Sequence, residues 1–169
     1  MTVHDLRGLF EYSYWANETL FGVVSQISPQ EFTKRVAGTY GSLRNTLVHA
    51  LSTEWGWLER CGGLERGPRL EPGSYPRAET LVSDWRRVAA GMREHLARLG
   101  DEDLGIAVEY PGAGGVTRSM PRGELLHHAA LHGVHYRGQA ALLLRELGYT
   151  PGHVDFLFYL ARTRGVPVW

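Results

Sequence analysis

ELLHHAALHGVHYRGQAALLLRELG, residues 124–148, is the stretch from which the fold can be inferred. Each residue of an α-helix turns the chain by about 100°, so positions four and seven apart return to nearly the same face. His128, His132 and His135 have that spacing, and Tyr136 follows His132 by four residues. One face of the predicted helix is therefore rich in imidazole. Its apolar residues need burial against other helices: Leu125, Leu126, Ala129, Ala130, Leu142, Leu143 and Leu144.

The rest of the chain predicts partners for this helix. Apolar residues recur at three-to-four spacing, as in helices with one buried face, and the long helices are expected over residues 3–26, 43–60, 78–99 and about 121–148. We therefore predict an all-α fold, a four-helix bundle forming a single domain over residues 1–169.

Shorter elements are expected between and after the long helices. Ser28–Glu31 has the sequence of a capping box with proline at the first helical position, so it predicts a short helix to about Lys34. Gly38–Gly41 predicts a break, and the Gly- and Pro-rich residues 61–77 predict a long connecting loop. Alternation over residues 106–119 around a glycine-rich turn predicts a small β-hairpin between the third and fourth long helices. Residues 153–163 predict a short final helix.

Composition excludes several classes of function. Lys+Arg and Asp+Glu both number 18, so the net charge is zero and nucleic acid is not an expected partner. Cys61 is the one cysteine, which excludes a disulfide framework and fits a cytoplasmic protein. We expect no signal peptide, because a basic segment followed by an apolar one is missing at the start. No run of about 18 apolar residues exists, so no membrane span is expected.

The histidine face predicts a metal site. Two histidines four apart on one helix, such as His128 and His132, can bind the same ion. His49 lies inside an otherwise apolar helix and is the candidate ligand from a second helix. The alternative for His49 is a hydrogen-bonded core residue without a ligand role. For Arg137 and Gln139, the alternatives are ordinary polar positions or groups that orient the ligands.

Other polar and aromatic residues have simpler interpretations. Glu54 lies five residues after His49, off its face, so a surface position or a role behind the ligands is preferred to direct metal binding. Core or interface positions are expected for Tyr12, Tyr14 and Trp15. Structural or solvent-facing positions are expected for four further histidines: His4, His95, His127 and His153.

Several motifs together resemble a known family. They are YSYWAN at residues 12–17, GSLRNTLVH at 41–49, EWGWL at 54–58, HGVHYRGQ at 132–139 and LRELGYTPGHVDF at 144–156. Their order and spacing resemble the DinB/YfiT-like superfamily of bacterial four-helix-bundle metalloproteins. The resemblance covers nearly the whole chain.

The resemblance carries functional expectations. It implies a bundle that is often a homodimer, with a divalent metal, zinc or nickel, held by three histidines. The superfamily includes S-transferases and isomerases that use the low-molecular-weight thiols bacillithiol or mycothiol. By position, the resemblance implies His49 and His132 as two ligands.

At the third ligand position this sequence departs from the family. That position, directly before Arg-Gly-Gln, holds Tyr136. A phenol with a pKa near 10 binds a divalent ion poorly unless the ion removes its proton. His128 could complete the set instead, and we rank it first on helix-face geometry. Otherwise Tyr136 binds as phenolate or through water, or His135 substitutes after a local helix rotation. The remaining alternative is that metal binding is weak or absent and the protein is a binding module.

Two functions follow as hypotheses. The first is a metal-dependent enzyme acting on a small-molecule substrate, either a thiol-dependent S-transferase or a related hydrolase. His49, His132 and His128 would hold the ion, and Tyr136 would be the catalytic proton donor unless it completes the ligand set. The second is a non-catalytic bundle that binds a small ligand or a partner at a degenerate metal site.

Overall fold

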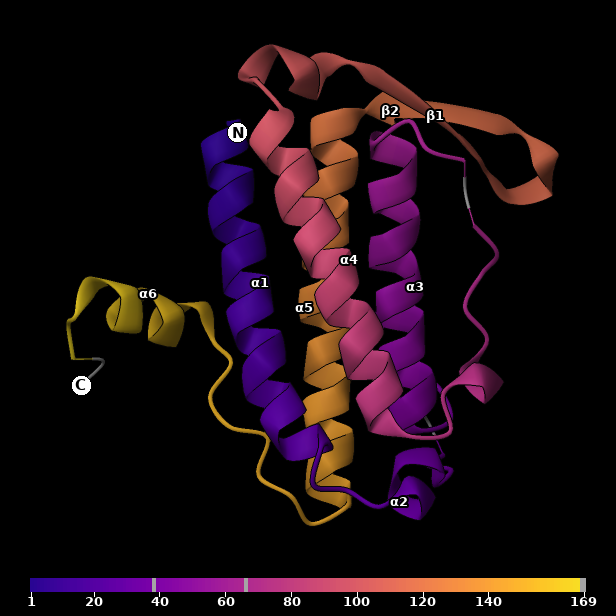
Figure 1. Cartoon of the computed structure of the whole chain (residues 1–169), viewed down its shortest axis with the longest axis vertical. Coiled ribbons are helices and arrows are strands. Elements are labelled where there is room, and N and C mark those ends of the chain that lie inside the picture. Colours follow the sequence, from indigo (N-terminus) through magenta and orange to yellow (C-terminus); the bar gives the residue numbers. More distant parts are fainter. Residues whose placement is uncertain (38, 66, 168–169) are drawn as a thin grey trace.

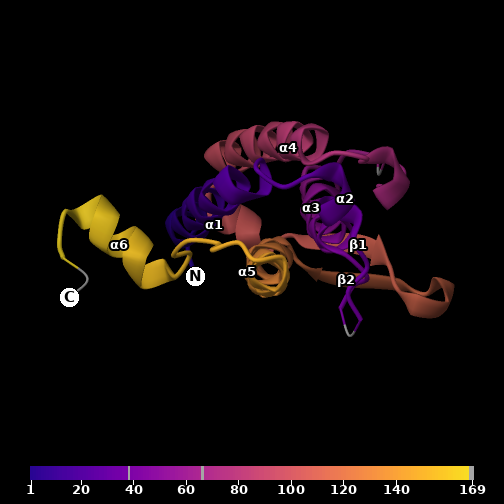
Figure 2. The ribbon, with the colours of Figure 1, turned by 90° about the horizontal axis from the view of Figure 1, so that it is seen from below.

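Four long helices pack side by side in this computed structural model, which describes residues 1–37, 39–65 and 67–167 (Figure 1). α3 packs against α4 and α5, and α1 packs against the same two helices. Figure 2 shows the four from below, with α1 opposite α3 and α4 opposite α5. Their bounds are Val3–Val24 for α1, Leu43–Cys61 for α3, Ala78–Arg98 for α4 and Arg122–Glu146 for α5. The predicted all-α four-helix bundle is confirmed.

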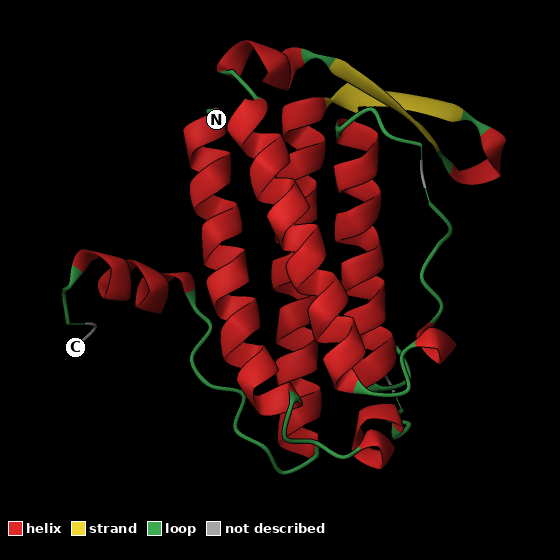
Figure 3. Cartoon of the chain, in the orientation of Figure 1, coloured by secondary structure: helices red, strands yellow, loops and turns green. Residues whose placement is uncertain are grey.

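The short elements lie at the ends and the side of the bundle. The strands β1 and β2 form the predicted antiparallel hairpin between α4 and α5, with Ala107 opposite Pro121 (Figure 3). The helix α6 lies on the outer side of α1 (Figure 2), where Phe156 and Tyr159 pack against the ring of Tyr12. The bounds are Pro29–Thr33 for α2, Ala107–Pro111 for β1, Thr117–Pro121 for β2 and Phe156–Arg164 for α6; three short 3₁₀ helices, which the sequence pattern did not predict, span Pro72–Ser74, Asp101–Gly105 and Ala113–Gly115.

Side chains at the helix starts explain where several helices begin. Thr2 and Asp5 form a capping box before α1. The predicted capping box of Ser28 and Glu31 is present before α2. The Ser42 hydroxyl accepts the amide N–H of Asn45 at the start of α3. These bonds satisfy amide groups that a helix leaves without internal partners.

The chain reverses just before α3. Gly38 lies outside the described residues. Gly41 has a φ of 104°, a conformation that favours glycine. Its carbonyl accepts a hydrogen bond from the amide of Val36. This turn positions Tyr40 beside α3, where its ring contacts His49.

The core fills the space between the four helices. Six of the seven apolar residues expected to be buried on α5 are buried, but Leu142 is 54% exposed, so that prediction is wrong for Leu142. Helix periodicity identifies a buried face well and its edges poorly. In the described residues, no helix combines the length and apolar composition that crossing a bilayer requires.

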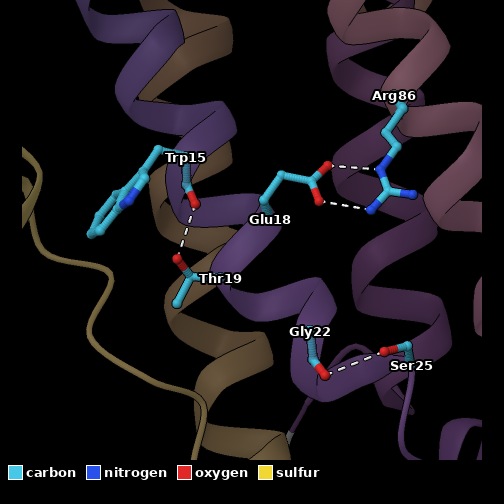
Figure 4. Close-up of polar contacts among 6 residues, drawn as sticks. All are labelled: Trp15, Glu18, Thr19, Gly22, Ser25 and Arg86. Atoms are coloured by element: carbon cyan, nitrogen blue, oxygen red, sulfur yellow. Dashed lines mark hydrogen bonds and ion pairs between the residues drawn. The ribbon is translucent and has the colours of Figure 1, made fainter.

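Two ion pairs connect α1 to α4 at the surface. Both nitrogens of the Arg86 fork donate to the carboxylate of Glu18, at 2.8 and 2.7 Å (Figure 4). Arg93 makes the same two-bond contact with Glu11, at 2.7 and 2.9 Å. These side chains are about half exposed. Each pair therefore fixes the orientation of the two helices more than it stabilises the fold.

Candidate metal centre

Two histidines from different helices meet between α3 and α5. The ring centroids of His49, on α3, and His132, on α5, lie 5.1 Å apart. An ion about 2.1 Å from one nitrogen of each ring, at nearly tetrahedral angles, would place the two centroids roughly 5 Å apart. The observed separation therefore suits two imidazoles that share one ion.

Tyr136 lies against both histidines. Its ring centroid is 4.4 Å from that of His132 and 4.5 Å from that of His49. Because Tyr136 follows His132 by one helical turn, their side chains project from the same face of α5. Tyr40, from the turn before α3, contacts His49 at 4.4 Å and Tyr136 at 5.6 Å. Two imidazoles and a phenol thus converge, with a second phenol beside them.

The surroundings keep both histidines in the neutral form. Burial is the main cause that lowers the pKa of His132 to about 4, with further lowering from the neighbouring rings of His49 and His128. Burial, and then the positive charge of Arg69, lowers the pKa of His49 below 6.5. A neutral imidazole has a lone pair free for a metal ion. Both side chains are therefore ready to bind a cation near neutral pH.

Tyr136 is held in its protonated form. Burial and the nearby Tyr40 raise the pKa of its phenol above 10. As a ligand, Tyr136 would have to lose this proton to the ion, and bound cations lower the pKa of their ligands strongly. As a phenol, it can donate a proton or a hydrogen bond.

One buried atom supports a ligand role for His49. Its Nδ1 is buried and forms no hydrogen bond within the described residues. A buried polar nitrogen without a partner is costly, so a native structure usually provides a use for it. An ion would satisfy such a nitrogen. With two imidazole nitrogens and a phenol oxygen, the residues present fit a divalent ion such as zinc or nickel.

His128 lies at the edge of this group. Its ring centroid is 5.7 Å from that of His132, and its ring packs edge-on against Trp57 on α3. Across the described ranges, no group of three His, Cys, Asp or Glu side chains is placed to hold one ion. The set of His49, His128 and His132 therefore stays a prediction, and Tyr136 is the third side chain that the structure brings together with His49 and His132.

The residues after the histidines connect α5 to α1. Arg137 is 3% exposed, and its Nη1 donates to Oδ1 of Asn17 at 2.9 Å. Its guanidinium also lies over the ring of Tyr12, 5.2 Å from the centroid. Arg137 is therefore more than an ordinary polar position, but its hydrogen bond joins α5 to α1 and does not reach a proposed ligand. Gln139 instead contacts His135, one turn back on the exposed side of α5, at 2.8 Å.

Glu54 lies in the core of the bundle and not at its surface. It is 6% exposed, so the surface position considered for it is wrong. Tyr14 donates its hydroxyl to Oε1 at 3.0 Å, and the indole N–H of Trp85 donates to Oε2 at 2.9 Å. Glu54 follows the buried Leu47 and Leu51 by seven and three residues, so helix periodicity contained the signal for its burial.

Three further histidines lie away from this group and, within the described part of the chain, form no common site with one another. His95 is 6% exposed and packs inside the bundle. His4 and His153 are exposed, and His153 stacks on Phe158 at 4.4 Å. These positions agree with the structural or solvent-facing roles expected of them. Core positions were expected for Tyr12 and Tyr14, and both are buried.

Two cavities differ in their relation to the histidines. One, of about 300 Å³, is lined by His49 together with Tyr40, Asn45, Ser52 and Arg69. The other, of about 360 Å³, lies beside α1 and α4, and its lining includes both surface ion pairs, Arg86–Glu18 and Arg93–Glu11, as well as five aromatic residues: Tyr14, Trp15, Phe21, Trp85 and Tyr159. The first cavity adjoins the candidate metal centre, so a molecule bound there would contact His49.

Comparisons with known proteins agree with this architecture. The sequence model described as "DinB family" matches residues 1–165. The chain is 23% identical over 167 residues to Protein DinB of Bacillus subtilis (strain 168), which covers 92% of this chain and 94% of that protein. The crystal structure of a DinB-like protein from Bacillus cereus ATCC 10987 is similar, with a TM-score of 0.69 and 21% identity. That match covers 87% of this chain and 95% of the other.

Proposed function

This chain belongs to the DinB family, and on that premise we propose that it is a divalent-metal-dependent enzyme acting on small molecules. The reaction class we favour is S-transfer from a low-molecular-weight thiol such as bacillithiol or mycothiol, with a related hydrolysis as the nearest variant. One observation carries the proposal: the rings of His49, His132 and Tyr136, from two helices, lie together. Their centroids are 4.4 to 5.1 Å apart.

Each side chain has a distinct role in this proposal. His49 and His132 would hold the ion, with the oxygen of Tyr136 or a nitrogen of His128 as third ligand. A bound divalent ion supplies Lewis-acid chemistry, which lowers the pKa of a thiol or water beside it. Where His128 completes the ligand set, Tyr136 keeps its proton, because its pKa is raised. Its hydroxyl then faces the site as a hydrogen-bond and proton donor to a leaving group.

Metal analysis of the purified protein tests this function. The wild-type protein, prepared without chelators and dialysed, is expected to retain about one zinc or nickel ion per chain, since structural and catalytic sites with N/O ligands bind such ions tightly. His49→Ala and His132→Ala are expected to lose the ion. His153→Ala, an exposed histidine elsewhere, is the matched control and is expected to retain it. A metal-free wild type that takes up no ion on addition would exclude the proposal.

The second candidate function is a non-catalytic bundle that binds a small ligand. The raised pKa of Tyr136 favours it, because a phenol that keeps its proton is a poor ligand. Thermal unfolding separates the two candidates. A metal-dependent protein gains stability from added zinc or nickel, because an ion that binds only the native state raises the midpoint temperature of unfolding. A protein with a degenerate site keeps the same midpoint temperature.

A further inference from the structure

We propose that the cavity beside His49 selects small molecules that carry an oxyanion, a carboxylate or phosphate group, and that Arg69 is the residue that binds it. The inference deepens the proposed function. It rests on that function only where it assumes that an ion is bound by His49, at one side of the cavity. His49 and Arg69 line the same space of about 300 Å³. That volume accommodates a small metabolite, at the lower end of ordinary ligand sites.

The loop after α3 is attached to that helix on both sides of Arg69. The amide of Gly67 donates to Oε2 of Glu59 at 3.2 Å. The amide of Leu70 donates to Oγ of Ser52 at 3.4 Å. Ser52 is three residues after His49, close to one turn further along the same face of α3. The two bonds hold the loop along α3, so Arg69 comes from a tethered backbone to the same cavity as His49.

The guanidinium of Arg69 is free to bind an anion. Arg69 is exposed, and among the described residues no carboxylate lies within ion-pair distance of it. By contrast, Arg86 and Arg93 are each paired with a glutamate. A planar guanidinium binds a carboxylate or a phosphate through two parallel hydrogen bonds. Arg69 thus provides an available anion-binding group in the cavity.

The other residues of the cavity limit what can bind. Asn45 and Ser52 supply an amide and a hydroxyl, which accommodate the polar part of a ligand without adding charge. Glu71 also lines the cavity, and its negative charge would repel a second anionic group. A ligand with one oxyanion and an otherwise neutral body fits this charge distribution better than a polyanion does.

The first arm of the test uses metal-free protein, so that it does not depend on an ion. Butyrate, inorganic phosphate and the neutral 1-butanol are titrated separately, and binding is followed through the NMR shifts of the amides of residues 45–52 and 67–71. We expect butyrate, phosphate or both to shift these amides and butanol not to. Response to butyrate alone or phosphate alone identifies which oxyanion the cavity takes.

Three variants assign the effect. Arg69→Gln is expected to weaken oxyanion binding about tenfold, which corresponds to the loss of one charge-assisted hydrogen bond. Arg77→Gln removes a positive charge from the end of the same loop, outside the cavity lining, and is expected to change binding less than twofold. Glu71→Gln is expected to strengthen it. Equal weakening by Arg69→Gln and Arg77→Gln would overturn the proposal, as would wild-type protein that binds neither oxyanion.

The second arm adds zinc and compares thiols. Mercaptoacetate, 3-mercaptopropionate and 4-mercaptobutyrate are each matched with the neutral alcohol of the same length, and affinities are measured by calorimetry. At least one acid is expected to bind about tenfold more tightly than its alcohol, and Arg69→Gln is expected to remove the difference. If the protein binds zinc but binds acids and alcohols equally well, the role of Arg69 is overturned and the proposed function stands. If the protein does not bind zinc, the proposed function is overturned, and the first arm alone decides whether Arg69 binds an oxyanion.

Discussion

The rings of His132 and Tyr136 lie 4.4 Å apart, one helical turn from each other on α5. Both contact His49 on α3, at 5.1 and 4.5 Å. Tyr136 therefore occupies the place where the DinB/YfiT-like resemblance implies a third histidine. In the metal site that we propose, the phenol either binds the ion or only adjoins it, and the first two predictions separate these cases.

Replacing Tyr136 by histidine should strengthen metal binding. A neutral imidazole binds zinc without first losing a proton at neutral pH, whereas the pKa of the Tyr136 phenol is raised by burial. Tyr136→His is expected to increase zinc affinity at least tenfold, about 1.4 kcal/mol. Competition with a chelator of known affinity measures it.

Tyr136→Phe is the matched control for that substitution. It removes only the hydroxyl and keeps the ring that packs on His49 and His132. If the phenolic oxygen is a ligand, Tyr136→Phe weakens zinc binding; if His128 completes the set, zinc binding is unchanged. Affinity for Tyr136→His at or below the wild-type value would show that this position does not face the ion.

The buried carboxyl of Glu54 should contribute to the stability of the folded state, although it is a charged side-chain type. Glu54→Ala would leave the hydroxyl of Tyr14 and the indole N–H of Trp85 without their acceptor. We expect a loss of about 3 kcal/mol in the free energy of unfolding, measured with urea. Glu54→Gln should cost less, because its carbonyl can accept from Trp85 while its amide donates to the oxygen of Tyr14. Equal losses for the two variants would contradict this interpretation.

Glu54 should also make stability depend on pH. Burial is the main cause that raises its pKa above 4.5, despite the lowering effect of its two hydrogen bonds. The folded state therefore holds this proton more tightly than the unfolded chain does. Its contribution is fully present below pH 4.5 and is lost as the pH rises through the higher, folded pKa. The stability of the wild type relative to Glu54→Gln should fall from pH 4.5 upward, and a difference that rises instead would contradict the assignment.

His132 should have the opposite pH dependence. Its pKa falls from 6.5 in the unfolded chain to about 4 in the folded protein. Between these values the unfolded chain binds more protons, so lowering the pH from 6.5 to 4 destabilises the metal-free protein. His132→Gln removes this titration, and its unfolding midpoint should decline less over that range. Parallel curves for wild type and variant would show that His132 titrates normally.

The contact between Arg137 and Asn17 should couple α5 to α1. The Nη1 of Arg137 donates to Oδ1 of Asn17 at 2.9 Å in a buried setting. A double-mutant cycle with Arg137→Met and Asn17→Ala should give a coupling free energy of about 1.5 kcal/mol, as for a hydrogen bond to a charged group. Strictly additive losses would show that the two side chains contribute independently.

The sequence predicted the helices better than the site. Three-to-four spacing identified the long helices, and the Ser28–Glu31 capping box marked the start of α2, because both are local patterns. It predicted that His49 and His132 come together between two helices, as they do between α3 and α5, but not which other side chains reach them. Tyr40 reaches His49 from a turn, and Arg69 reaches the cavity through two loop hydrogen bonds, so neither follows from periodicity. The burial of Glu54 could have been predicted, but its charge argued for the surface.

Anomalous scattering at the zinc absorption edge, from crystals grown with one equivalent of zinc, tests the central claim most directly. We expect a single strong peak between α3 and α5, about 2.1 Å from one imidazole nitrogen each of His49 and His132. A peak bound by other side chains, or no peak between these two rings, would contradict a shared metal centre in this bundle.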